Sequence, residues 1–120
     1  MLRPVMVLGS LLLLSATCVF GQDSEALYNQ KCGNCHAKDG SGRTAAAQKL
    51  EVPDLRTKRI RDMSDEEIYN STAHGTQHKE YPHAFLHTGM TEEQIRGLVR
   101  YIRVLQSSST AANPRGSGKP

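Results

Sequence analysis

Two cysteines and a histidine are the residues whose types and spacing could do chemistry, in the order Cys32-Gly33-Asn34-Cys35-His36. In such a C-x-x-C-H segment each thiol can add to one vinyl group of a porphyrin, giving two thioether bonds. The histidine is then placed under the ring, where one of its nitrogens can bind the iron. A bare C-x-x-C would also fit a redox-active dithiol or half of a zinc site, and the adjoining histidine favours haem over both. The segment therefore predicts one covalent haem of the c type (heme c), held by Cys32, Cys35 and His36, with His36 as an iron ligand.

The N-terminus has the features of a secretory signal peptide. Arg3 provides a positive charge, residues 5–14 are mostly apolar, and the residues around Gly21 fit the small-x-small rule for cleavage after it. The apolar run is too short for a comfortable membrane span, which favours cleavage over a retained anchor. Cys18 could suggest a lipid-anchored protein, but the residues before it do not fit that signal. We therefore expect residues 1–21 to be removed, Cys18 included.

Export agrees with the haem prediction. A periplasm-like compartment is where c-type haem is attached, and it is oxidising, so unpaired thiols are disfavoured there. After cleavage only Cys32 and Cys35 remain, and the haem would use both. We expect a periplasmic or otherwise exported protein without a stable membrane span.

The charge of the chain excludes one class of partner. Without residues 1–21 the chain has 14 basic and 12 acidic residues, a net charge of +2, which is too mild for a nucleic-acid-binding protein. A local basic cluster could steer docking onto an acidic partner, although such a run is more often a solvated loop face. The cluster consists of Arg56, Lys58, Arg59 and Arg61.

Residues 22–106 are expected to form one small domain. Residues 107–120 contain no aliphatic side chain larger than alanine and cannot bury enough apolar surface to offset their ordering entropy, so a disordered tail is predicted there. A domain this small builds a thin core by itself, and the apolar faces of a haem would supply what is missing.

Three helices and no strand are predicted, which makes the class all-α. The first runs from about Ser24 into the haem segment, with Asp23 or Ser24 as its N-cap, and residues 38–43 form a loop. The other two begin with near-copies of one signal: a hydroxyl N-cap with Glu or Gln three residues later, flanked by apolar residues that form a hydrophobic staple. These signals are Met63-Ser64-Asp65-Glu66-Glu67-Ile68 and Met90-Thr91-Glu92-Glu93-Gln94-Ile95. The first of these two helices should end near Gly75, and the last carries an apolar stripe through Leu105.

Over residues 23–106 the chain resembles the class I small monohaem c-type cytochromes. An aromatic residue stands four positions before the first haem cysteine, a Gly-rich loop and a Pro-Asp-Leu segment follow, and the last helix has a leucine and an aromatic three apart. The residues concerned are Tyr28, Asp39-Gly40-Ser41-Gly42, Val52-Pro53-Asp54-Leu55, Leu98 and Tyr101. The resemblance implies a small cytochrome c fold in which the first and last helices cross, so that Tyr28 meets Leu98 and Tyr101. It also implies that Pro53 flanks the haem on the side of His36, whose other ring nitrogen a nearby carbonyl would bind; which carbonyl does so stays open.

The chain departs from this family at the sixth iron ligand. The family usually has methionine followed by proline, and here Tyr81 stands in the place of that methionine. Counting back from the last helix leads to His83, which we expect to be the second metal ligand. His78, in the same segment, and Met90 are the alternatives, and Met90 already has a role in the staple before Thr91. Imidazole in place of a thioether would lower the reduction potential.

The expected function is the transfer of single electrons by an exported cytochrome, with redox proteins such as an oxidase or a dehydrogenase as partners. The sequence contains no nucleophile–base arrangement, phosphate loop or catalytic carboxylate pair, so an enzyme is not expected. Two alternatives stay open. The first is a haem enzyme or gas sensor with a weak or open sixth site. The second is a dithiol switch without haem.

Overall fold

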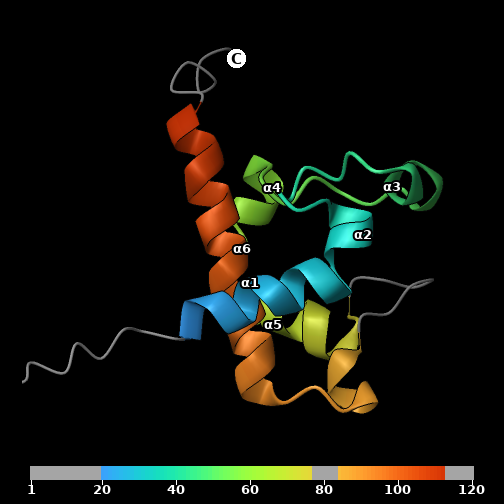
Figure 1. The fold of residues 1–120 in the computed structure, drawn as a ribbon, viewed down its shortest axis with the longest axis vertical. Helices are drawn as coiled ribbons and strands as arrows, with labels where there is room; N and C mark the ends of the chain where they lie inside the picture. Colours follow the sequence, from blue (N-terminus) through green and yellow to red (C-terminus); the bar gives the residue numbers. More distant parts are fainter. Residues whose placement is uncertain (1–19, 77–83, 113–120) are drawn as a thin grey trace, which may run out of the picture.

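The computed structural model describes residues 20–76 and 84–112, which contain α-helices, one short 3₁₀-helix and no strand (Figure 1). The elements are α1 (Phe20–Lys31), α2 (Gly33–His36), α3 (Ala45–Leu50), α4 (Lys58–Arg61), α5 (Asp65–His74), η1 (Phe85–Thr88) and α6 (Glu92–Ala112). The predicted all-α class and the predicted cytochrome c fold are confirmed. The sequence did not predict α3, α4 or η1, because four to six residues are too few to show a helical period.

The starts of the two later helices are as the sequence predicts. The Ser64 hydroxyl accepts a hydrogen bond from the Glu67 N–H, and the Glu67 carboxylate accepts one from the Ser64 N–H, which is a complete capping box. Thr91 and Gln94 make the same reciprocal pair at the start of α6. Helix α5 ends at Gly75, whose φ of 69° lies in the left-handed region that glycine adopts without strain.

The outer ends of the first and last helices differ from the predictions. Helix α1 begins at Phe20, one turn earlier than expected, so neither Asp23 nor Ser24 is its N-cap. Helix α6 continues to Ala112, so residues 107–112, for which a disordered tail is predicted, are helical in the structure. Four residues of this stretch have hydroxyls that bond back to carbonyls three or four positions earlier in the helix. They are Ser107, Ser108, Ser109 and Thr110.

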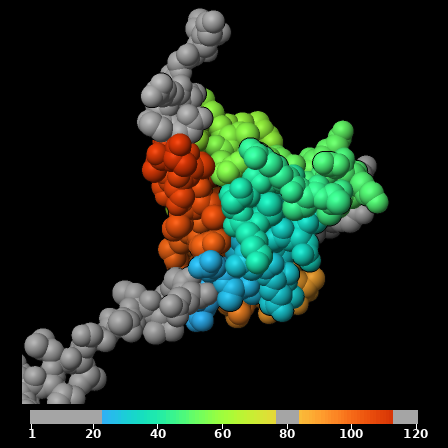
Figure 2. Space-filling view, turned by 45° about the horizontal axis from the view of Figure 1, so that its top comes forward, coloured from blue at the N-terminus to red at the C-terminus, as the bar shows by residue number. Residues whose placement is uncertain are grey.

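The core forms where α1 crosses α6, as the resemblance implies (Figure 1). The rings of Tyr28 and Tyr101 lie 5.2 Å apart between centroids, and Tyr28 shares one buried cluster with Leu98 and Ile95. Figure 2 shows α6, in orange and red, lying directly against the blue and teal segment that contains α1 and α2. Helix α5 packs against α6 and contributes Ile68, Tyr69 and Ala73 to the same core.

Within residues 20–76 and 84–112, no helix combines the length and the apolar character that crossing a bilayer requires. Residues 1–19 lie outside the described part of the chain, so the cleaved signal peptide stays a prediction.

Candidate haem site

A cavity of about 250 Å³ lies between α1, α2, α5 and α6 and the segment from Glu51 to Met63. Its walls are mainly apolar, and the haem segment forms one of them. It is lined by Tyr28, Cys32, His36, Glu51, Pro53, Leu55, Arg59, Ile60, Met63, Ile68, Ser71, Thr72, Leu98 and Ile102. We call this the central cavity. Apolar walls with a few polar groups are typical of cofactor sites.

Helix α2 brings the predicted haem residues together in a single turn. Cys32 stands at its N-cap, and the N–H groups of Cys35 and His36 both bond to the Cys32 carbonyl, at 3.1 and 2.8 Å. Both cysteines are half-buried. The side chain of His36 is only 6% exposed, with Nδ1 fully buried. Cys32 and His36 thus face the central cavity from one side, and Cys35 lies between them in the turn.

The Pro-Asp-Leu segment lies against the same cavity. Pro53 and Leu55 both line it with His36. The Gly-rich loop runs close to this segment, since a Cβ added to Gly42 would lie 3.1 Å from the Val52 carbonyl oxygen and 3.3 Å from that of Pro53. Pro53 and His36 therefore line the same cavity, and the position of Pro53 beside a bound haem stays a prediction.

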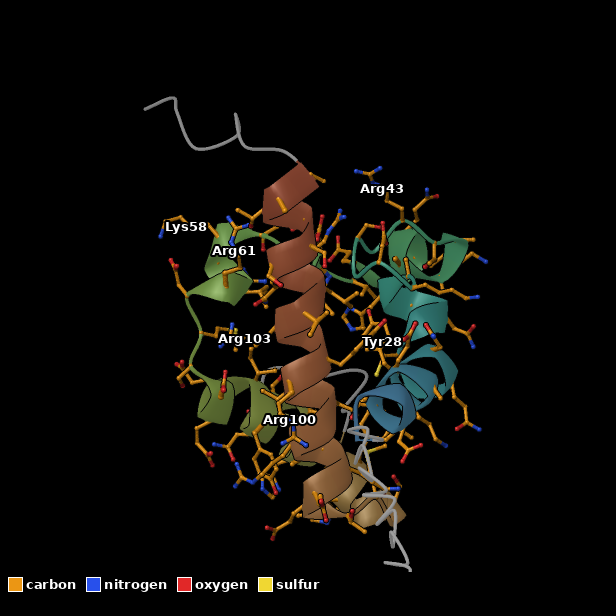
Figure 3. All side chains as sticks on the ribbon, turned by 60° about the vertical axis from the view of Figure 1, so that its left-hand side comes forward. Tyr28, Arg43, Lys58, Arg61, Arg100 and Arg103 are labelled. Atoms are coloured by element: carbon orange, nitrogen blue, oxygen red, sulfur yellow. The ribbon has the colours of Figure 1, made fainter. Side chains whose placement is uncertain are left out.

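The basic cluster of the sequence divides into different roles. Arg56 donates two hydrogen bonds of 2.9 Å to Asp54 and lies 3.5 Å from Asp39. The Arg56 guanidinium lowers the pKa of the Asp54 carboxyl, while the Ser41 hydrogen bonds are the main cause that lowers the pKa of Asp39. Two other residues of the cluster lie on α4, where Lys58 pairs with Asp62 and Arg61 is exposed to solvent. Figure 3 shows Lys58 and Arg61 together on α4, away from Arg43.

Of the basic cluster, Arg59 lines the central cavity, a role that the sequence does not predict. Ser71 and Thr72 of α5 also line it and were not predicted either; the Thr72 hydroxyl donates to the Ile68 carbonyl at 2.9 Å. A helical projection from Ile68 would have found them, because positions three and four residues further on share its face.

The predicted sixth ligand cannot be placed. His83 and the alternative His78 lie outside the described residues. Met90 is 9% exposed and belongs to the hydrophobic core, and it is not among the described residues that line the central cavity. His74 and His87 are exposed at the two ends of the segment that is not described, with ring centroids 5.9 Å apart.

The environment of Cys32 disfavours its charged form. Burial, with a smaller contribution from Cys35, raises the pKa of the Cys32 thiol to about 12. Redox-active dithiols have the opposite property, a lowered pKa that supplies a thiolate near neutral pH.

Comparison with known families gives a match that covers most of the chain. The model of the family described as "Cytochrome C oxidase, cbb3-type, subunit III" matches residues 21–102. No match was found among curated proteins. The matched range begins in α1, contains the haem segment and the whole wall of the central cavity, and ends in α6 after Ile102. The chain therefore belongs to this family of cytochrome c domains, and it is a haem-binding cytochrome c.

Proposed function

We propose that this protein is an exported c-type cytochrome that carries single electrons through one haem, covalently bound by Cys32 and Cys35 and ligated by His36. The observation that carries the proposal is the position of Cys32 and the buried His36 on one wall of a mainly apolar cavity. When bound, the haem supplies an iron that alternates between the ferric and ferrous states.

The chain's own residues would hold the haem in this site. Tyr28, Leu98 and Ile102 line the cavity from α1 and α6 and would give a bound haem an apolar surface to pack against. His36 is carried on a short helix that packs on α1 and α3, which keeps its imidazole in place during electron transfer. Arg59 is the cation available at the cavity wall for a haem carboxylate.

On the sixth side of the iron we propose His83, with His78 and then Met90 as the alternatives. The burial of Met90 in the core among residues such as Ile95 supports a packing role for its side chain. If the imidazole of His83 is the ligand, protons should compete with the iron for its nitrogen below roughly pH 5.

The proposed partner is another redox protein. The family description names a subunit of an oxidase, and we propose an electron-transfer complex of that kind, or a dehydrogenase, as the place where the chain works.

The test is expression in cells that export and mature c-type cytochromes, followed by haem staining of a denaturing gel. The wild-type chain should keep its haem on the gel, whereas Cys32→Ala, Cys35→Ala and His36→Ala should lose it or yield no holoprotein. Cys18→Ala is the matched control, because this cysteine lies outside the haem segment, and it should retain the stain. Stain retained by the Cys32→Ala, Cys35→Ala double variant would overturn covalent attachment.

Spectra of the holoprotein separate the remaining alternatives. His83→Ala should change the coordination of the iron, and Met90→Ala should not. Slow and incomplete binding of carbon monoxide to the reduced protein at neutral pH supports an electron carrier. Rapid and complete binding would favour the gas sensor or enzyme instead.

A further inference from the structure

The residue directly after His36 has a backbone conformation that suits only glycine. Ala37 has φ 63° and ψ 159°. A side chain in this region collides with its own backbone, so residues other than glycine stay there only where their surroundings hold them. Because Ala37 follows a predicted iron ligand, the contacts that hold this strained conformation also bear on the position of His36.

Four hydrogen bonds hold the carbonyls of Cys35, His36 and Ala37. The Gly-rich loop supplies two of them from its backbone: the Gly42 N–H bonds to the His36 oxygen at 2.8 Å, and the Gly40 N–H to the Ala37 oxygen at 3.1 Å. Carbonyls at the end of a helix have no partner within it, so such bonds fix where the turn ends.

Side-chain hydroxyls supply the other two bonds. The Thr44 hydroxyl donates to the Cys35 carbonyl at 2.9 Å, and the Tyr28 hydroxyl donates to the Ala37 carbonyl at 2.9 Å. Tyr28 therefore connects the middle of α1 to the strained residue.

Tyr28 is itself held firmly. Its side chain has no exposed surface, and its ring packs against Tyr101. Figure 3 shows it between α6 and the segment that carries α2. Burial raises the pKa of its phenol well above the usual value, so the hydroxyl keeps its proton and remains a donor. A phenylalanine would fill the same space without this bond.

We propose that Tyr28 is a positioning residue for the proximal histidine: its hydroxyl holds the Ala37 carbonyl, keeps Ala37 in its strained conformation, and so sets the direction in which the His36 imidazole meets the iron. The proposal rests on the proposed role of His36. Without the hydroxyl, Ala37 can relax toward an ordinary conformation and take the adjacent histidine with it.

The test compares four holoprotein variants: Tyr28→Phe, Ala37→Gly, the double variant, and Tyr101→Phe as the matched control. Tyr101→Phe removes a hydroxyl from the same ring pair but none from the haem turn. The readouts are the g-values of the ferric haem in electron paramagnetic resonance and the reduction potential, which report the orientation and bonding of the axial imidazole.

Tyr28→Phe should shift both readouts, and Tyr101→Phe should leave both as in the wild type. Glycine adopts the conformation of residue 37 at little cost, so adding Ala37→Gly should return the Tyr28→Phe readouts toward the wild-type values. Unchanged readouts in Tyr28→Phe, or a shift that Ala37→Gly does not reduce, would overturn the proposal.

Two further outcomes are also decisive. If Tyr28→Phe yields no holoprotein, its recovery in the double variant supports the proposal, and failure of both variants counts against it. Failure of the underlying function is recognised separately, because the wild-type chain would then show no haem on the stained gel.

Discussion

Helices α1 and α6 approach each other closely at Gly97, and replacing this glycine by alanine tests the contact. A Cβ added to Gly97 would lie 2.6 Å from the Ser24 hydroxyl oxygen and 3.6 Å from the Ser24 Cβ. The first distance is a collision and the second is an ordinary contact, so the hydroxyl oxygen alone makes the site too small for alanine.

Two opposing effects set the stability of Gly97→Ala. Replacing glycine by alanine inside a helix stabilises it by about 1 kcal/mol. Forcing an extra methyl group into a packed interface costs about 1–3 kcal/mol. In the wild-type background we therefore expect a net loss of about 0–2 kcal/mol in the free energy of unfolding. With Ser24→Ala the collision disappears, and the same substitution should gain about 1 kcal/mol.

Urea unfolding of the wild type, the two single variants and the double variant measures this as a thermodynamic cycle. The coupling between the two substitutions should be at least about 1 kcal/mol, as for residues in direct contact. Gly33→Ala is the matched control, since its Cβ would meet nothing nearer than 3.8 Å, and its effect should not depend on Ser24. A Gly97→Ala protein that is about 1 kcal/mol more stable than the wild type would refute the collision. If Gly97→Ala lowers the free energy of unfolding equally with and without the Ser24 hydroxyl, the collision is with some other atom.

Three further predictions concern other parts of the fold. Ser64→Ala removes the N-cap of α5 and should cost about 1 kcal/mol in thermal unfolding, while Glu67→Ala, which keeps the hydroxyl N-cap and removes the two bonds that Ser64 donates to the carboxylate, should cost less. Gln106→Ala removes a 4% exposed amide that bonds to the loop before α4, and should lower the urea midpoint by an amount equivalent to about 1–3 kcal/mol. The folded-state pKa of Asp54 is lowered by Arg56, so the stability that this pair provides is present above pH about 3.9, the unfolded value, and is lost as the pH falls through the lower folded value. Arg56→Gln should therefore flatten the loss of stability measured between pH 5 and pH 2; an unchanged acid dependence would show that the pair contributes nothing.

The features that the sequence predicts well are encoded within a few neighbouring residues. The capping box of Ser64 and the αL end at Gly75 depend on residues in the same turn, so a local pattern reveals them. The haem segment is local in the same way. The crossing of α1 with α6 is not local, and it came from the resemblance through Tyr28, Leu98 and Tyr101.

The features that the sequence does not predict depend on contacts between distant segments. The bond from Tyr28 to Ala37 joins two residues nine positions apart, and no composition rule indicates that an alanine would take a positive φ. The extension of α6 was missed for another reason. The low hydrophobicity of residues 107–120 predicts a disordered tail, but it does not distinguish such a tail from the exposed end of a helix that begins in the core.

The last turns of α6 have a structural role beyond the range that the family model matches. Arg103, just after that range, donates to the carbonyls of Arg61 and Met63 and to the Asp65 carboxylate. Gln106, one turn later, donates to the Leu55 carbonyl at 2.8 Å and accepts from Arg103. Figure 3 shows Arg103 directed from α6 toward the side of α4 and α5.

These bonds attach one wall of the central cavity, the segment from Leu55 to Met63, to α6. Met63 and Leu55 line that cavity with their side chains, and their backbone carbonyls are the groups that α6 binds. Because a buried carbonyl that loses its partner carries a desolvation penalty, the loop from Leu55 to Met63 and the helix stabilise each other. The shape of the proposed haem site therefore depends on α6 at least as far as Gln106, and a truncation at residue 102 would remove the support of one cavity wall while leaving every residue that lines it.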